Sequence, residues 1–163
     1  MKTSIEIVPY TKEMHPALLD IWQRGVKKTH TFLSQEDYEF YNQVVDEQAL
    51  PGVEVWVARG RTGQPLGFTG MQGRQIEMLF IDPEVHRMGV GTALLDFAVK
   101  IKGCIEVDVN EQNPQARNFY KKYGFVEVSR TPLDDRGKPY PVIHLELPDC
   151  LERKQADRES KPG

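Results

Sequence analysis

A glycine-containing segment in the middle of the chain has the composition of an anion-binding helix start. It reads His86-Arg87-Met88-Gly89-Val90-Gly91-Thr92 and precedes a run of apolar residues at helical spacing. The first turn of a helix has unpaired backbone N–H groups and the positive end of the helix dipole. Glycine lets such a backbone approach a phosphate closely. The segment therefore predicts a phosphate site, with a plain glycine-rich helix start as the alternative.

Two common dinucleotide motifs do not account for this segment. A Rossmann fingerprint needs a third glycine, where this chain has Leu94, and it must follow a strand directly, whereas several residues separate Ile81 from Gly89. The repeated βαβ pattern of that fold is also missing. A P-loop needs Gly-Lys followed by Ser or Thr, which the segment lacks. The predicted phosphate site therefore belongs to another fold.

A second motif follows after one predicted strand. It reads Asn113-Pro114-Gln115-Ala116-Arg117-Asn118-Phe119-Tyr120-Lys121-Lys122-Tyr123-Gly124-Phe125. Asn113 suits a helix N-cap, Pro114 the first turn, and Gly124 the end of the helix. An apolar helix face would explain Ala116, Phe119 and Tyr123, but it leaves Asn113 and Tyr120 unexplained.

The two motifs, in this order and at this spacing, resemble the GNAT N-acetyltransferases. That family has Gln/Arg-x-x-Gly-x-Gly/Ala at a helix start and Asn-x-x-Ala-x-x-Phe-Tyr-x-x-x-Gly-Phe one strand later. The resemblance extends over residues 5–147. His86 stands where the family has Gln or Arg, and the neighbouring Arg87 can supply the positive charge. Segments 29–33, 109–113 and 137–141 resemble a branch of small bacterial acetyltransferases of undefined substrate.

This resemblance implies an enzyme that moves an acetyl group from acetyl-CoA directly to an amine. The pyrophosphate would lie against the glycine segment. Strand 77–81 would splay from strand 104–109 and admit the pantetheine arm, and its backbone would polarise the acetyl carbonyl. Asn113 would orient the cofactor as well as cap its helix, with capping alone as the alternative. The implied cofactor-binding residues are Leu79, Phe80, Ile81, Arg87, Met88, Gly89, Val90, Gly91, Thr92, Asn113 and Tyr120.

Acetyl transfer also needs a general acid and a base. By resemblance, Tyr120 would protonate the departing thiolate, a modestly uphill step because a phenol has a pKa of about 10 and a thiol about 8.5. The alternative is a tyrosine that only packs against the cofactor. Glu77 is the candidate base, directly or through water. It alternates with Leu79 and Ile81, so we expect desolvation to raise its pKa, unless it is a solvated strand glutamate.

The acceptor is less constrained by the sequence. His30 and Tyr140 are candidate acceptor-site residues, because the loop after the first helix and the late hairpin flank that site in the family. We favour a small amine or amino compound as acceptor. The alternatives are a protein N-terminus or lysine and, in another class, a weakly catalytic acyl-CoA-binding module.

Hydrophobic periodicity predicts one domain with a mixed α/β (α+β) sheet at residues 1–148. The element order is β-α-α-β-β-β-α-β-α-β-β, as in a GNAT fold with a splayed central sheet. Ser34 and Thr11 are helix caps, and Val90, Leu94, Phe97 and Ile101 form the apolar stripe of a helix over 89–102. The charged tail, 149–163, is predicted to be mobile. Predicted strands are 4–8, 53–59, 65–71, 75–81, 104–109, 125–130 and 142–147; the other helices begin near 12 and cover 36–49 and 114–123.

The composition of the chain excludes several classes of binding partner. The net charge of this 163-residue chain is −3, and its basic residues are scattered, which argues against nucleic acid. It has no apolar run of about 18 residues and no signal core at its start, so we expect no membrane partner and a cytoplasmic location. Two cysteines and four histidines without metal-ligand spacing predict no metal site. The oligomeric state stays open, a homodimer included.

Overall fold

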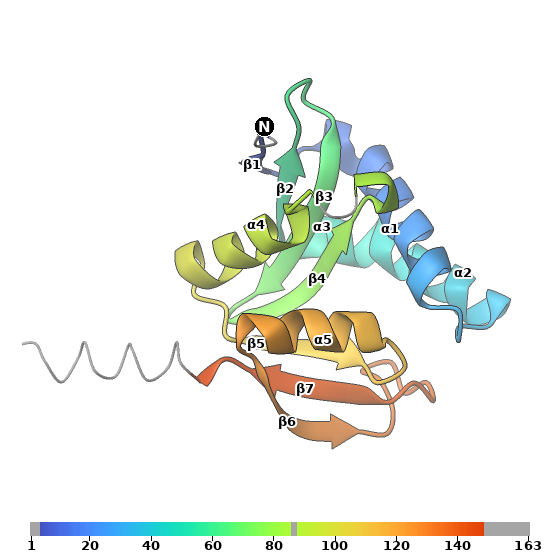
Figure 1. Ribbon diagram of the computed structural model, residues 1–163. Coiled ribbons are helices and arrows are strands. Elements are labelled where there is room, and N and C mark those ends of the chain that lie inside the picture. Colours follow the sequence, from blue (N-terminus) through green and yellow to red (C-terminus); the bar gives the residue numbers. More distant parts are fainter. Residues whose placement is uncertain (1–3, 86–87, 149–163) are drawn as a thin grey trace, which may run out of the picture. The chain divides into compact units, whose positions relative to one another are not determined.

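The computed structural model describes residues 4–85 and 88–148 (Figure 1). The chain divides into two compact units, with the boundary between Cys104 and Ile105. The residues of the charged tail, 149–163, lie outside the described part, as do His86 and Arg87.

The first unit is built on four antiparallel strands. They are β1 (Glu6–Pro9), β2 (Glu54–Arg59), β3 (Pro65–Gln72) and β4 (Gln75–Ile81), paired in this order. The alternation of apolar residues gives the strands their two faces, because successive side chains point to opposite sides. Val57 packs on one face in a cluster with Phe68, and Ala58 packs on the other face with Val90. Both faces of this sheet are therefore buried.

Helices from the N-terminal half cover the first face. They are a 3₁₀ turn (Lys12–Met14), α1 (His15–Thr29) and α2 (Gln35–Val44). Leu18, Ile21 and Trp22 of α1 pack into the cluster with Phe68. The predicted Ser34 cap is confirmed, since its hydroxyl accepts a hydrogen bond from the Asp37 N–H at 3.1 Å. Thr11 has the backbone of an N-cap, but its side chain makes no capping bond.

The helix after Ser34 continues beyond its predicted end at residue 49. It passes through a π turn (Val45–Ala49) into the short α3 (Leu50–Gly52). Pro51 lies in the first turn of α3. The helix ends directly after it, at Gly52, because Val53 has an extended backbone.

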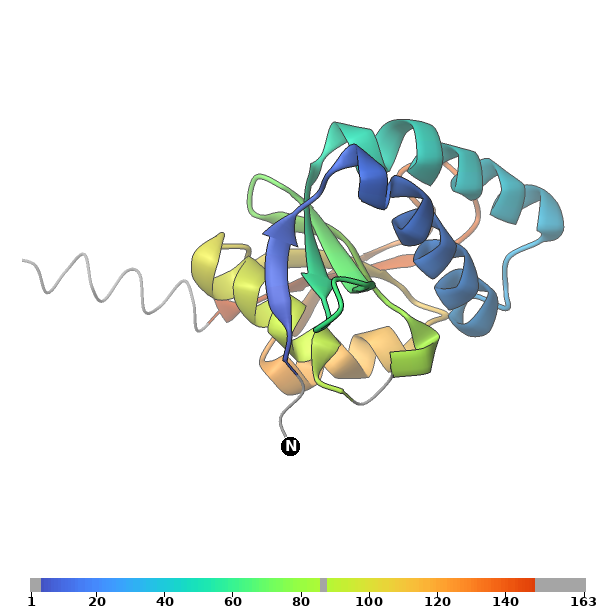
Figure 2. The ribbon, with the colours of Figure 1, turned by 90° about the horizontal axis from the view of Figure 1, so that it is seen from above.

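Helix α4 (Val90–Asp96) covers the second face of the sheet, opposite α1 and α2 (Figure 2). It continues as a π turn (Phe97–Ile101). The predicted apolar stripe is correct for Val90 and Leu94, which are buried, and wrong for Ile101, which is 69% exposed. A π turn holds more residues per turn than an α-helix, so the buried positions shift to Ala98 and Val99.

The second unit places one helix against three strands. Strand β7 (Val142–Glu146) lies between β5 (Glu106–Asn110) and β6 (Val126–Thr131) and is antiparallel to both. Helix α5 (Pro114–Tyr123) lies over one face of this sheet (Figure 1). The predicted end of α5 is confirmed, because Gly124 has a φ of 129° that favours glycine.

The mixed α/β class and the predicted order of elements are confirmed. Predicted strand ends agree with the observed ends to within two residues. Among the described residues, no helix combines the length and apolarity that a membrane span requires.

Candidate active site

The end of β4 is held from its paired edge and from both faces. Leu79, Phe80 and Ile81, the predicted pantetheine-binding residues, lie opposite Thr69, Phe68 and Gly67 of β3. Phe80 packs with its ring centroid 5.8 Å from that of Phe68 and 6.4 Å from that of Trp22. Leu79 and Ile81 pack toward α4 instead. The backbone of this segment is therefore rigidly placed within the first unit.

Gly89 begins α4 in a conformation that favours glycine. Its φ is 80°, in the left-handed region, and its carbonyl accepts the first helical bond, from the Ala93 N–H at 3.0 Å. A Cβ at this position would meet nothing within 4 Å, so the backbone conformation rather than crowding selects glycine. Val90 and Gly91 are buried and Thr92 is exposed. Met88 is exposed, and Arg87, also predicted to bind the cofactor, is outside the described residues.

Asn113 and Tyr120 both point away from solvent on α5. They are two helical turns apart, and their side chains are 9% and 5% exposed. The Oδ1 atom of Asn113 accepts a hydrogen bond from the Ala116 N–H at 3.2 Å, so the predicted cap is confirmed. The Tyr120 ring meets Phe119 and Phe125 edge to face, with centroids 5.2 and 5.6 Å apart. Burial raises the pKa of the Tyr120 phenol well above its usual value. The hydroxyl therefore keeps its proton throughout the physiological pH range.

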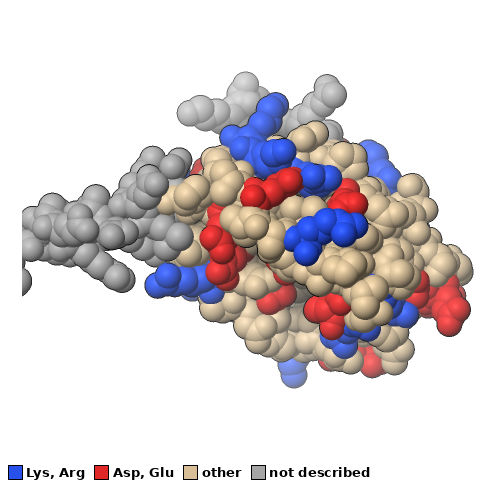
Figure 3. All heavy atoms as spheres, turned by 90° about the horizontal axis from the view of Figure 1, so that it is seen from below, with Lys and Arg blue, Asp and Glu red and all other residues tan. Residues whose placement is uncertain are grey.

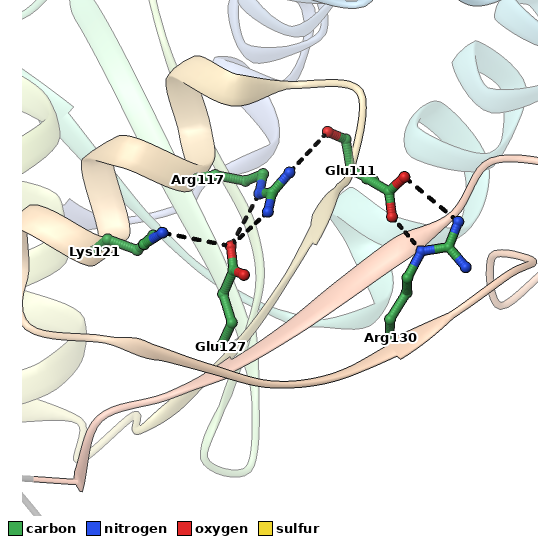
Figure 4. Close-up of polar contacts among 5 residues, drawn as sticks. All are labelled: Glu111, Arg117, Lys121, Glu127 and Arg130. Atoms are coloured by element: carbon green, nitrogen blue, oxygen red, sulfur yellow. Dashed lines mark hydrogen bonds and ion pairs between the residues drawn. The ribbon is translucent and has the colours of Figure 1, made fainter.

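Charged side chains fasten α5 to β6 and to the turn before the helix (Figure 4). Nε and Nη2 of Arg117 contact Oε1 of Glu127 at 3.0 and 2.9 Å. Nη1 of Arg117 donates to the backbone oxygen of Glu111 at 3.5 Å, and Arg130 pairs with the Glu111 carboxylate. These contacts fix the helix that carries Tyr120 within the second unit. Sequence reasoning missed them, because no local pattern pairs residues across a helix end and a turn.

A shallow pocket of about 610 Å³ lies on the outer side of α5. Its lining includes Lys121 and Lys122, together with the amides Gln115 and Asn118. Phe119 completes the lining, and Nζ of Lys121 is 3.9 Å from Oε1 of Glu127, so this surface combines apolar and charged groups. Over the face shown in Figure 3, basic and acidic side chains are interspersed and form no basic stripe.

Glu77 lies on β4 at an exposed position. We expected Glu77 to alternate with Leu79 and Ile81 and its carboxylate to be desolvated, but the register of β3 and β4 shifts here: Gly70 lies opposite Met78 and Met71 opposite Ile76, so the alternation is interrupted at Glu77. Strand β4 therefore leaves Glu77 accessible rather than enclosed, and this corrects the expected environment. An exposed carboxylate can still be reached by an acceptor or by water.

His30 follows α1 and is fixed in one tautomer. The Thr29 hydroxyl donates to the Gly25 carbonyl oxygen at 2.8 Å, so its oxygen accepts from Nδ1 of His30 at 2.7 Å. Nδ1 therefore carries the proton and Nε2 the lone pair. Burial lowers the pKa of His30 to about 4, which keeps the ring neutral at pH 7. A neutral Nε2 can accept a hydrogen bond.

Tyr140, the other predicted acceptor residue, is buried in the second unit with 8% of its surface exposed. It ends a loop whose conformation is set by Asp134. Oδ1 of Asp134 accepts from the N–H groups of Arg136 and Lys138 at 3.0 and 2.9 Å, and the Tyr140 N–H donates to the Lys138 carbonyl oxygen. Tyr140 therefore lies at the end of a well-ordered turn.

Comparison with known proteins gives consistent matches. Residues 51–127 match the family described as acetyltransferase (GNAT) domain. The chain is 43% identical, over 128 residues, to the peptidyl-lysine N-acetyltransferase YjaB of Escherichia coli K12; the match covers 78% of this chain and 86% of the relative. The solution structure of apo-form YjaB from Escherichia coli has a TM-score of 0.82 at 40% identity and covers 88% of this chain and 97% of that chain. PaiA N-acetyltransferase from Thermoplasma acidophilum, solved in complex with coenzyme A, shares the fold (TM-score 0.66, 22% identity, 88% and 99% covered).

Fold and matches together define an acyltransferase that acts on amines. The chain belongs to the GNAT family of N-acetyltransferases, whose acetyl donor is acetyl-CoA. The resemblance stated from the two sequence motifs is thereby confirmed.

Proposed function

We propose that this protein transfers the acetyl group of acetyl-CoA to lysine side chains of peptides or proteins. The observation that carries the proposal is the similarity to a relative that is named a peptidyl-lysine N-acetyltransferase. The sequence alone favoured a small amine, with a protein lysine as the alternative. The relative's name supports the alternative instead.

In this proposal, Tyr120 is the general acid. The lysine nitrogen forms a bond to the acetyl carbon, the carbon–sulfur bond breaks, and the thiolate takes the phenol proton. Burial supports this role, because it keeps Tyr120 protonated until the thiolate develops beside it. The same burial makes the proton transfer more uphill, so the hydroxyl must lie close to the sulfur to compensate.

The acceptor nitrogen must also lose a proton. Glu77 is accessible on β4 and is proposed to take it directly or through water. His30 is a weaker candidate base, because its conjugate acid has a pKa of about 4. We propose that Nε2 of His30 instead accepts a hydrogen bond from the acceptor and orients it. Tyr140 is proposed to line the acceptor side.

The cofactor-binding residues in this proposal are those of β4, the glycine segment and α5. The left-handed Gly89 and the free N–H groups at the start of α4 fit a phosphate. The backbone of Leu79, Phe80 and Ile81 fits an extended pantetheine arm. Asn113 uses its oxygen to cap α5, and its side-chain N–H groups are proposed to face the cofactor.

A thiol-release assay with acetyl-CoA tests the acceptor. Lysine peptides and small polyamines are compared at equal concentration, and mass spectrometry locates the acetyl group. We expect acetylation of a lysine Nε and at least about tenfold higher kcat/KM for peptides, the ratio that 1.4 kcal/mol of binding provides. Higher turnover of small amines would contradict the lysine acceptor. Coenzyme A binding without release on any acceptor would identify an acyl-CoA-binding module.

A further inference from the structure

The carboxylate of Asp82 joins three segments of the first unit. Asp82 directly follows β4, and its own N–H donates to the Leu66 carbonyl oxygen at 2.8 Å. Its Oδ1 and Oδ2 accept from Nη1 and Nη2 of Arg24, on α1, at 2.7 and 3.1 Å. Oδ1 also accepts from the Glu84 N–H at 2.9 Å. One side chain therefore connects α1, the end of β4 and the turn that follows β4.

The ion pair has the geometry and environment of a strong contact. The guanidinium and carboxylate meet through two parallel bonds, and the Asp82 side chain is only 16% exposed. Asp20, one turn earlier on α1, accepts from Nε of Arg24 at 2.9 Å and holds the guanidinium from the other side. The Arg24 bonds keep the pKa of Asp82 below its usual value. The pair is therefore ionised throughout the range in which an acetyltransferase would be assayed.

Asp82 stands between two parts of the proposed cofactor site. Leu79, Phe80 and Ile81 precede it on β4. The turn that follows, Pro83–Val85, begins with a bond from the Val85 N–H to the Asp82 carbonyl oxygen at 3.0 Å. The Met88 N–H then donates to the Val85 carbonyl oxygen at 3.3 Å, just before Gly89. Asp82 thus fixes the first turn after β4, which ends at Val85.

Strands β3 and β4 approach each other closely at the end of β4. A Cβ on Gly67 of β3 would lie 2.8 Å from the Phe80 carbonyl oxygen and 3.1 Å from Cγ1 of Val90. This close approach fixes the pairing of the two strands at Phe80, and the polar contacts of Asp82 fix the chain beyond Ile81, the last residue of β4. The side-chain partner of Asp82 in these contacts is Arg24 of α1. The same helix ends at Thr29, directly before His30.

We propose that Arg24 and Asp82 form a positioning pair that holds the end of β4 and the turn after it in place and so sets the affinity for the donor. The inference rests on the proposed function, because it assumes that this segment binds coenzyme A. Neither residue is assigned a contact with the substrate. Loss of the pair should weaken donor binding more than it slows the chemical step.

Calorimetry with coenzyme A, combined with steady-state kinetics, tests the pair. Asp82→Asn and Arg24→Gln should each raise the Kd for coenzyme A and the KM for acetyl-CoA by roughly tenfold, because the folded chain then holds the binding arrangement for a smaller fraction of the time, with a smaller change in kcat. The double variant should be no worse than the weaker-binding single variant, because both lose one shared contact. Arg24→Lys keeps the positive charge, so its Kd and KM should lie between those of wild type and Arg24→Gln. Arg59→Gln breaks the exposed ion pair between Arg59 and Glu6 in the same unit and serves as the control.

The outcomes separate the two claims. If wild type binds coenzyme A and folded Asp82→Asn, Arg24→Gln and Arg24→Lys bind it equally well, the positioning role is overturned while the proposed function stands. A lowered melting temperature with unchanged Kd would likewise leave only a structural ion pair. If wild type binds no coenzyme A, the proposed function fails and this inference with it. Arg59→Gln should leave both Kd and KM unchanged, and an equal effect there would also overturn the inference.

Discussion

Arg117 of α5 and Glu127 of β6 face each other across the second unit, with two guanidinium nitrogens 3.0 and 2.9 Å from one carboxylate oxygen (Figure 4). Both side chains are about 30% exposed, so solvent screens the pair only in part. The contact ties the helix of Tyr120 to an edge strand whose own residues are all exposed. It therefore restrains that helix against that strand.

The Arg117 contact should be measurable as stability. We expect Glu127→Gln to lower the free energy of unfolding by up to about 1 kcal/mol, the upper end for ion pairs near a surface. Lys121→Gln is the control, because Nζ of Lys121 is 3.9 Å from the same carboxylate and the side chain is half exposed. This substitution should lower the free energy of unfolding by less. Urea unfolding measures the free energy of unfolding of both variants. Equal losses would show that Arg117 is not the main partner of Glu127.

Tyr120→Phe removes one oxygen and keeps the ring packed against Phe119 and Phe125. If the hydroxyl delivers the proton, kcat should fall by roughly 10²–10⁴. The KM for acetyl-CoA should move much less, because the lost interaction belongs to the transition state. Tyr123→Phe, on the same helix, is the matched control and should keep near-normal kcat. A folded Tyr120→Phe enzyme with wild-type kcat, on an acceptor for which chemistry limits the rate, removes Tyr120 from the mechanism.

Glu77→Gln tests the base. With the carboxylate gone, turnover depends on the free-amine fraction of the acceptor, which is smallest at low pH. We therefore expect kcat/KM to fall most at the acidic end of the profile and to approach wild type at the basic end. Rates of both proteins are recorded from pH 6 to pH 9. Superimposable profiles would make Glu77 a structural residue of β4.

Gly89→Ala and Gly73→Ala form a matched pair. Both glycines have φ in the left-handed region, 80° and 60°, and a Cβ at either would meet nothing within 4 Å. Each substitution should therefore cost about 1 kcal/mol of stability through backbone strain alone. Only Gly89→Ala should also raise the Kd for coenzyme A, because Gly73 lies in a hairpin turn away from the predicted phosphate site. Equal Kd values for the two variants would move that site elsewhere.

His30 should make stability depend on pH. Its pKa is about 4 in the folded chain and 6.5 as a free side chain, so the unfolded chain binds the proton first as pH falls. The lowered pKa of His30 therefore contributes its full stabilisation of the folded state above pH 6.5, and this contribution is lost progressively as the pH falls to 4. Between pH 7.5 and pH 5, wild type should lose about 2 kcal/mol more than His30→Gln in urea unfolding. Parallel losses in the two proteins would show that His30 titrates normally.

Residues close together in the sequence determine much of the secondary structure. The Ser34 and Asn113 caps and the glycine at the end of α5 act within a few residues, so their spacing alone predicted these boundaries. The alternation of apolar residues predicted the strands in the same way. The two motifs around Gly89 and Tyr120 also predicted the family, because their spacing reflects a fixed order of elements.

Tertiary structure decided what depends on residues far apart. The π turn at Phe97–Ile101 rotates the helix relative to its predicted stripe, and Ile101 turns to solvent. Arg24 and Asp82 are 58 positions apart, and only folding brings their charges together. The exposure of Glu77 and the low pKa of His30 follow from packing around each side chain rather than from residue type. Burial and long-range pairing are properties of the folded chain, since both arise from contacts that no local pattern contains.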